Sequence, residues 1–320
     1  MAITDFRKAK SLKVTDVSGQ PIISRTACLK ITSGDDTTTG TGQIVLDWSE
    51  IGSKADIGVY DENDNLLDYH FESFDATAET AVIWVYRSWV RDGTVQAQVA
   101  YGDGPSDQSV AASTVFDKES DLEGGWLLNE TSGDAIDVTS NNNDGSITGA
   151  TQGVTGQVDG AYSFDGNDDY ISLGDVYSVN GPKTVSLWAK WDTSNDGERA
   201  AWSTEKTESW NFQLCDNNNG KITLKTWDSA ETTINGPDIT TGEWYYVVGI
   251  SDSDLNLKLF VDGVEIGTAS WSGNSKNTEN YIGAGDLGDL EPHDGDIDNV
   301  FLHSVVLTSD EITALYDATK

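Results

Sequence analysis

The stretch Gly160-Ala-Tyr-Ser-Phe-Asp-Gly-Asn-Asp-Asp-Tyr-Ile-Ser-Leu decides the fold of the second half of the chain. Apolar and polar residues alternate on both sides of an Asp/Gly/Asn turn, which is the pattern of two half-buried strands joined by a tight connection. The same period of two recurs in Thr184-Val-Ser-Leu-Trp-Ala-Lys-Trp and in Leu255-Asn-Leu-Lys-Leu-Phe-Val. Many short strands of this kind predict two stacked antiparallel sheets in a jelly roll.

The first third of the chain has the same alternation in shorter runs, among them Ala27-Cys-Leu-Lys-Ile and Thr80-Ala-Val-Ile-Trp-Val-Tyr. Turn-forming residues such as Asp61-Glu-Asn-Asp-Asn separate these runs. The periodicity lapses after Tyr101, and an acidic segment begins at Lys118. We therefore predict an all-β chain with two domains, an N-terminal antiparallel β-sandwich at residues 1–118 and a β-jelly-roll at residues 119–320.

A single helix is predicted, over Ser309-Asp-Glu-Ile-Thr-Ala-Leu-Tyr near the end of the sequence. Thr308 or Ser309 is the expected N-cap, and acidic residues occupy the first turn. We expect the helix to pack on the jelly roll through one apolar face. The residues of that face are Ile312, Leu315 and Tyr316.

The chain is strongly acidic, with 54 acidic against 19 basic residues and a formal net charge of −35. The acids run from Asp5 to Asp317 and do not form a tail, so the whole surface is acidic. Molar salt shrinks the Debye length to about 3 Å and screens such self-repulsion. We predict a halophilic source. The alternative is an acidic secreted or calcium-loaded protein from an ordinary habitat.

The charge pattern argues against a nucleic-acid partner, because a phosphate-binding face needs clustered lysine and arginine. Basic residues cluster only at Arg7, Lys8, Lys10 and Lys13, where they are expected to flank a first strand.

Cysteines and apolar segments give further expectations. Cys28 and Cys215 are the two cysteines, and we expect both to be buried, in different domains, without a disulfide between them. The residues after Met1 lack the apolar core of a signal peptide, and no apolar stretch is long enough for a membrane span. We therefore expect neither an export signal nor membrane insertion.

The second domain resembles the LamG-type, concanavalin-like family. The motifs that carry the resemblance occur in the family's order and are Gly125-Trp-Leu-Leu-Asn-Glu-Thr-Ser-Gly-Asp, Asp137-Val-Thr-Ser-Asn-Asn-Asn-Asp-Gly, the stretch from Gly160 to Tyr170, Phe260-Val-Asp-Gly, Gly295-Asp-Ile-Asp-Asn-Val and Leu307-Thr-Ser-Asp-Glu-Ile. The resemblance implies a binding sandwich whose first and last strands pair, often with one structural calcium ion at that edge.

The first domain resembles domain of unknown function 2341, a family often found ahead of LamG-type modules in archaeal and bacterial surface proteins. Its motifs here are Ala55-Asp-Ile-Gly-Val-Tyr-Asp-Glu-Asn, Leu67-Asp-Tyr-His-Phe-Glu, Val82-Ile-Trp-Val-Tyr and Ala100-Tyr-Gly-Asp. The sequence departs from the family at Phe6-Arg-Lys, where a Trp-x-Tyr-Arg segment is usual. This family implies no activity.

Catalysis is not predicted. A glycosidase on this scaffold needs two carboxylates about 5.5 or 6.5–9.5 Å apart, and the nearest segment offers Asp296 and Asp298 without a following Glu. We interpret both as structural. The three histidines, His70, His293 and His303, lack a nucleophile elbow and zinc-ligand spacing.

A structural calcium ion is the one cofactor that the sequence suggests, because calcium takes oxygens from acidic loops. The alternative is that these segments are acidic turns without an ion. The candidate ligands are Glu130, Asp137, Asn143, Asp144 and Asp298. A second candidate cluster is Asp165, Asn167, Asp168 and Asp169.

Four tryptophans lie in or beside polar loops and are the candidates for stacking on sugar rings. They are Trp202, Trp210, Trp227 and Trp271. Four others lie in alternating strands and are expected in the core, namely Trp84, Trp126, Trp188 and Trp244.

We hypothesise a non-enzymatic surface protein of the virion of a haloarchaeal tailed virus, such as a capsid turret, spike or tail fibre. Its expected partners are a host surface glycan or glycoprotein, other virion proteins and further copies of itself. The alternative is a cell-surface adhesin or carbohydrate-binding module, and a glycoside hydrolase is less favoured.

Overall fold

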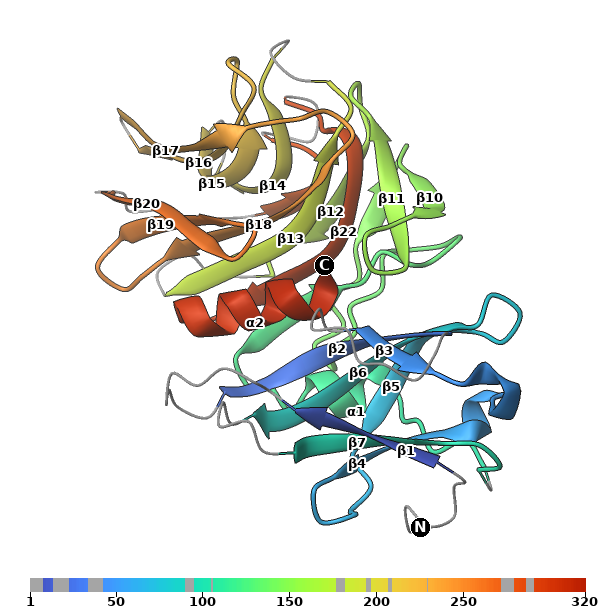
Figure 1. Cartoon of the computed structure of the whole chain (residues 1–320). Coiled ribbons are helices and arrows are strands. Elements are labelled where there is room, and N and C mark those ends of the chain that lie inside the picture. Colours follow the sequence, from blue (N-terminus) through green and yellow to red (C-terminus); the bar gives the residue numbers. More distant parts are fainter. Residues whose placement is uncertain are drawn as a thin grey trace. The chain divides into compact units, whose positions relative to one another are not determined.

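The computed structural model describes residues 8–13, 23–33, 43–89, 95–104, 106–176, 182–193, 197–206, 209–228, 230–271, 279–285 and 291–320. The chain divides into two compact units, one formed by Met1–Ser120 with Asp317–Lys320 and the other by Asp121–Tyr316. The division lies two residues after the boundary that the sequence predicted. Strands dominate both units (Figure 1), so the all-β prediction is confirmed.

In its described part the first unit contains a four-stranded sheet of order β3-β2-β6-β5 and a three-stranded sheet of order β1-β7-β4. The pairing of β2 with β3 is parallel, and the others are antiparallel. The elements are β1 (Lys8–Lys13), β2 (Ile23–Ser33), β3 (Gln43–Leu46), β4 (Ile57–Asp61), β5 (Tyr69–Asp75), β6 (Thr80–Trp89), β7 (Val95–Tyr101), α1 (Ala112–Phe116) and two 3-10 turns at Trp48–Glu50 and Lys54–Asp56.

The core of the first unit lies between these two sheets, because apolar residues at alternate strand positions point inward from both. Tyr69 of β5 is fully buried, and its hydroxyl donates a hydrogen bond of 2.8 Å to the carbonyl of Ile57 in β4. This bond ties the two sheets together. The N-terminal sandwich predicted from the sequence is therefore confirmed.

The second unit is a larger sandwich. Its eight-stranded sheet has the order β10-β11-β22-β13-β18-β19-β20, with β8 also paired to β22, and its seven-stranded sheet has the order β17-β16-β15-β14-β21-β12-β9. The strands are β8 (Leu122–Trp126), β9 (Ser146–Thr148), β10 (Thr151–Thr155), β11 (Gly160–Asp165), β12 (Tyr170–Gly174), β13 (Lys183–Trp191), β14 (Arg199–Lys206), β15 (Ser209–Asp216), β16 (Lys221–Asp228), β17 (Ala230–Asp238), β18 (Trp244–Ser251), β19 (Asn256–Val261), β20 (Val264–Ser270), β21 (Glu279–Ile282) and β22 (Asp294–His303).

The two sheets enclose one continuous apolar core. Trp126 of β8 and Trp202 of β14 meet in it with ring centroids 6.2 Å apart, and both side chains are fully buried. Large aromatic rings fill a thin sandwich core efficiently. β8 pairs with β22, so the pairing of the first and last strands that the family resemblance implied is confirmed.

A C-terminal helix, α2 (Ser309–Thr319), lies along the outer face of the eight-stranded sheet (Figure 1). Thr308 caps it, because its hydroxyl accepts from the N–H of Glu311 while the Glu311 carboxylate accepts from the N–H of Thr308. The Tyr316 ring lies 5.8 Å from Trp188 and 6.2 Å from Tyr246. The predicted helix and its packing are confirmed, and no helix in the described part of the chain is long and apolar enough to cross a membrane.

Candidate functional site

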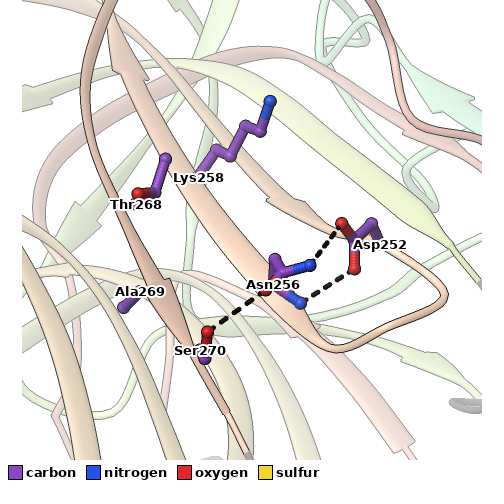
Figure 2. Close-up of a pocket in the computed structure, with 6 residues that line it drawn as sticks. All are labelled: Asp252, Asn256, Lys258, Thr268, Ala269 and Ser270. Carbon is purple, nitrogen blue, oxygen red and sulfur yellow. Dashed lines mark hydrogen bonds between the residues drawn. The ribbon is translucent and has the colours of Figure 1, made fainter.

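A polar depression of about 460 Å³ lies on the hairpin formed by β19 and β20, at one edge of the eight-stranded sheet. We call it the hairpin depression. Figure 2 shows its lining residues, which are Asp252, Asn256, Lys258, Thr268, Ala269 and Ser270. Leu257 and Leu259 of β19 are fully buried in the sandwich core. Asn256 and Lys258 alternate with them and therefore face outward, which places the depression on the outer face of the sheet.

The strand register sets two rungs of facing side chains across the hairpin depression. Asn256 is paired with Ser270, and Lys258 is paired with Thr268. The Ser270 hydroxyl donates to the Asn256 side-chain oxygen at 3.2 Å. The rungs are two residues apart along β19, so they are separated by about 7 Å. Amide, hydroxyl and ammonium groups therefore line up along one short, rigid hairpin.

Asp252 closes one end of the hairpin depression (Figure 2). Its carboxylate accepts hydrogen bonds from the backbone N–H of Asp254 at 2.9 Å and from the backbone and side-chain nitrogens of Asn256 at 2.8 and 2.9 Å. Burial pushes the pKa of Asp252 upward, but these hydrogen bonds outweigh it and the pKa lies below the usual value. The carboxylate thus stays ionised and can accept hydrogen bonds from a hydroxylated ligand.

The outer face of the seven-stranded sheet carries a second polar group of residues, which lies under loops. The Ser203 hydroxyl of β14 donates to the carbonyls of Ala284 and Gly285 at 2.7 and 2.8 Å. The register continues this row to Gln213 of β15 and Lys225 of β16, and all three side chains are buried. Buried polar groups need partners, and this row finds them in the loops that cover the face.

Glu198 and Glu291 are neighbours over that row, and each acts on the other. Lys225 forms an ion pair with Glu198, and the Gln213 amide donates to Glu291. Burial raises the pKa of Glu291 to about 7, and the neighbouring Glu198 adds to the rise. A proton on Glu291 removes one of the two negative charges from this covered position. The sequence did not single out either glutamate, because they are far apart in the chain and lie in different loops.

A third polar site is the turn between β11 and β12. Asp165, Asp168 and Asp169 each place a carboxylate oxygen there, and these three oxygens lie within 4.8 Å of one another. Asp169 is buried, and burial together with the charges of Asp165 and Asp168 raises its pKa. Three neighbouring carboxylates of this kind could bind a metal ion. These residues belong to the second candidate cluster named from the sequence.

The calcium ligands favoured from the sequence are engaged with protein groups. The Asp137 carboxylate accepts from the backbone nitrogens of Gly125, Thr139 and Asn143 at 3.0, 3.0 and 2.9 Å, and the Thr139 hydroxyl adds a fourth bond. The Asn143 side chain donates to the carbonyl of Glu123 at 2.8 Å. These bonds shape the loop after β8 and leave the Asp137 carboxylate fully occupied.

The other three candidate ligands have similar structural roles. Asp144 accepts from the backbone N–H of Asp137 at 2.9 Å. Glu130 accepts from the N–H of Ile136 at 3.1 Å and from the Tyr162 hydroxyl at 2.7 Å. Asp298 is fully buried and accepts from the backbone nitrogens of Gln157 and Val158, both at 2.8 Å. Within the described ranges, Glu130, Asp137 and Asp298 do not form a cluster of the kind seen at Asp165.

The candidate stacking tryptophans fall into different environments. Trp202 and Trp271 are buried in the sandwich core, so their expected position at the surface is corrected. Trp227 of β16 is 41% exposed. The side chain of Trp210 lies outside the described residues. Trp84, Trp126 and Trp188 are buried, as expected, and Trp244 is half-buried.

Comparison with known proteins agrees with this architecture. Residues 165–313 match the model of the concanavalin A-like lectin/glucanases superfamily, and residues 53–140 match the domain of unknown function 2341. The second match crosses from the first unit into the start of the second. No curated protein matches the chain. The second unit thus has the fold of a concanavalin A-like sandwich, and the segment before it is similar to a family without assigned function.

Solved structures share the fold at low identity. Domain 4 of AbnA, a GH43 extracellular arabinanase from Geobacillus stearothermophilus solved with arabinotriose, is 22% identical with a TM-score of 0.51, over 61% of this chain and 98% of that one. The receptor-binding domain of botulinum neurotoxin C/D mosaic serotype is 15% identical with a TM-score of 0.50, over 62% of this chain. The binding domain of Paraclostridial Mosquitocidal Protein 1 is 14% identical with a TM-score of 0.50, also over 62%. This chain spans only about half of each toxin domain, 51% and 52%.

Proposed function

We propose that this protein is a non-catalytic surface protein that binds glycans through the hairpin depression of its concanavalin A-like domain. The observation that carries the proposal is the lining of this depression. An amide, an ammonium and two hydroxyl groups line it on one hairpin, and the Asp252 carboxylate lines it from the turn before that hairpin. Such groups exchange hydrogen bonds with sugar hydroxyls, and a preorganised site loses little conformational entropy on binding.

The fold relatives support a binding role. The arabinanase domain was solved with arabinotriose, and the two toxin domains are described as receptor-binding or binding domains. Their identities to this chain are low, so the choice of site rests on this chain's own residues. The outer face of the seven-stranded sheet is the less suitable place, because loops bury its polar row at Ser203, Gln213 and Lys225.

The absence of an enzymatic activity is part of the proposal, and the geometry of the paired carboxyl groups supports it. Glu198 forms an ion pair with Lys225, and Glu291 accepts from the Gln213 amide, whereas a glycosidase keeps both of its carboxyl groups open to the sugar. Asp296 forms an ion pair with Lys190, and Asp298 anchors the backbone near Val158. These carboxylates therefore have structural partners in place of a substrate.

We further propose that calcium is the ion for the turn at Asp165, Asp168 and Asp169. Three carboxylates and the backbone carbonyls of a tight turn are oxygen donors, which calcium prefers. The ion would neutralise the charges of Asp165 and Asp168, which add to burial in raising the pKa of Asp169. Its role there would be structural, because it would fix the connection between β11 and β12.

For its biological setting, we propose a halophilic source and a place on the virion surface of a haloarchaeal tailed virus. The net charge of −35 supports the high-salt setting. Other virion proteins and further copies of this chain would be its partners, and a cell-surface adhesin is the rival setting. Sedimentation of the purified protein at about 2–3 M salt separates the two: we expect a closed cyclic oligomer, and a strict monomer would contradict the virion setting.

The glycan-binding proposal is tested with intact haloarchaeal cells and their isolated surface glycoprotein, before and after deglycosylation, at about 2–3 M salt where the charge is screened. We expect saturable binding of the purified chain that deglycosylation abolishes. Binding that survives deglycosylation would indicate a protein receptor and would contradict the proposal. No binding would point to an architectural role.

A further inference from the structure

We propose that the hairpin depression selects acidic saccharides, with the Lys258 ammonium as the group that binds the sugar carboxylate. This inference rests on the glycan-binding function proposed above and specifies its ligand class. It depends on three features of the depression, namely the environment of Lys258, the arrangement of the other polar groups, and the shortage of cations in the rest of the chain.

The Lys258 ammonium has no directional contact with the residues that the structure describes. It makes no hydrogen bond, ion pair or ring contact with them, and Asp252 acts on it only as a nearby charge. Thr268, across the hairpin, likewise makes no side-chain hydrogen bond with a described residue. Both groups therefore present donors to a ligand at the same rung of the hairpin (Figure 2).

Each other lysine whose side chain the structure describes has a hydrogen bond, an ion pair or a ring contact. Lys30 donates to the backbone carbonyls of Thr319 and Lys320, and Lys54 and Lys183 lie over the rings of Phe71 and Phe212. With 54 acidic residues against 19 basic ones, an unpaired lysine is unexpected on a surface of this kind. The described lysines that form ion pairs are Lys8, Lys118, Lys190, Lys221, Lys225 and Lys320. In the depression the Asp252 carboxylate is engaged by Asp254 and Asn256 and makes no ion pair with Lys258, so this ammonium is suited to an external anion.

The remaining groups fix the orientation of such a ligand. Asp252 would repel a carboxylate, so the acidic group of the sugar lies at the Lys258 rung. The sugar hydroxyls then face Asp252, Asn256 and Ser270 about 7 Å further along the hairpin. One end of the depression thus recognises negative charge and the other recognises hydroxyl groups, which together describe a saccharide that carries a carboxylate, such as a uronic acid.

The test uses the full-length chain at the lowest salt concentration that preserves its circular dichroism spectrum, so that charge screening is small. Titration calorimetry compares trigalacturonate with its methyl ester, which keeps the shape and removes the charge. A panel of neutral trisaccharides is included. We expect the acid to bind at least about fivefold more tightly than the ester, because a hydrogen bond to a charged group outweighs a neutral one.

Three variants connect that preference to one side chain. Lys258→Met should remove it, and Lys258→Arg should keep it. Lys221→Met changes the net charge by the same amount on the other sheet and should also keep it. Three outcomes overturn the acidic-saccharide inference while the glycan-binding function stands. They are equal binding of acid and ester, preference for a neutral sugar, and an unchanged preference for the acid in Lys258→Met. Absence of binding to every saccharide and to the cell-surface glycoprotein overturns both.

Discussion

The Asp252 carboxylate holds Asn256 by two hydrogen bonds, one of 2.8 Å from the backbone nitrogen and one of 2.9 Å from the side-chain amide. This clamp joins the turn before β19 to the first residue of the strand. It also orients the Asn256 oxygen, which accepts from Ser270 across the hairpin. The wall of the hairpin depression is therefore fixed before any ligand arrives.

Asp252→Ala removes the clamp. We expect the free energy of unfolding to fall by about 1 kcal/mol and the glycan affinity to fall about five- to tenfold, measured by denaturant titration and calorimetry. Asp61→Ala is the matched control, because Asp61 makes the same set of bonds to Asn63 and Asn65 in the first unit. A similar loss of affinity in the control would show that the effect is not local to the depression.

Thr268→Val tests the hydroxyl of the second rung at nearly constant side-chain volume. The Thr268 side chain is exposed and makes no hydrogen bond with the described residues, so stability should stay within about 0.5 kcal/mol of the parent. The affinity for glycan should fall about threefold or more. Thr151→Val, on the edge strand β10 at the other end of the same sheet, should change neither quantity. Unchanged binding in Thr268→Val would move the site away from this rung.

The raised pKa of Glu291 leads us to expect that the free energy of unfolding depends on pH. The pKa of Glu291 is about 7 in the folded protein, against an ordinary value of 4.5. The folded state therefore keeps a proton that the unfolded state loses, so the contribution of the protonated carboxyl is complete below pH 4.5 and is lost as the pH rises through about 7. Between pH 5 and 8 we expect the parent to lose about 2 kcal/mol more stability than Glu291→Gln, which stays neutral.

The measurement for Glu291 is denaturant unfolding of both proteins at several pH values at constant molar salt, because the many other carboxylates also respond to pH. Glu231→Gln, an exposed residue of β17, is the control and should follow the parent. Parallel stability curves for the parent and Glu291→Gln would show that the pKa of Glu291 is not raised in the folded protein.

If calcium binds the turn at Asp165, Asp168 and Asp169, we expect it to change the melting temperature. After dialysis against a chelator, added calcium should raise the melting temperature of the parent by several degrees, because an ion that binds only the folded state stabilises it. Asp168→Asn should reduce this response strongly, whereas Asp134→Asn, an exposed residue outside the turn, should keep it. An equal response in both variants would place the ion elsewhere, and no response in the parent would contradict a calcium site.

The sequence was sufficient for the fold because strand alternation and helix capping are local signals. The alternation around Tyr162 and Tyr170 predicted two strands joined by a tight turn, which are β11 and β12, and Thr308 with Glu311 marked the start of α2. These signals depend on residues within a few positions of each other, and the structure preserves them.

The positions of the tryptophans show where local patterns fail. A β-bulge between Ala200 and Trp202 shifts the register of β14, so Trp202 points into the core. Trp271 follows the last residue of β20. Its backbone N–H donates to the Leu255 carbonyl at 2.9 Å, and its ring is buried in the sandwich core. Trp227 has no such irregularity and lies at the surface, as expected.

The site was only partly accessible from the sequence. The Asp252-to-Asn256 spacing is a local turn signal and could have indicated the clamp. The facing of Lys258 and Thr268 depends on the hairpin register, and the meeting of Glu198 with Glu291 depends on the closure of the whole sandwich. Such contacts come from tertiary structure, which residue spacing does not encode.

The most direct test of the central claim is a crystal structure of the protein at molar salt with a saccharide that it binds. We predict saccharide density in the hairpin depression, with hydroxyl groups at Asp252 and Asn256. Density over the outer face of the seven-stranded sheet, beside Trp227 and Lys225, with an empty hairpin depression, would contradict the account.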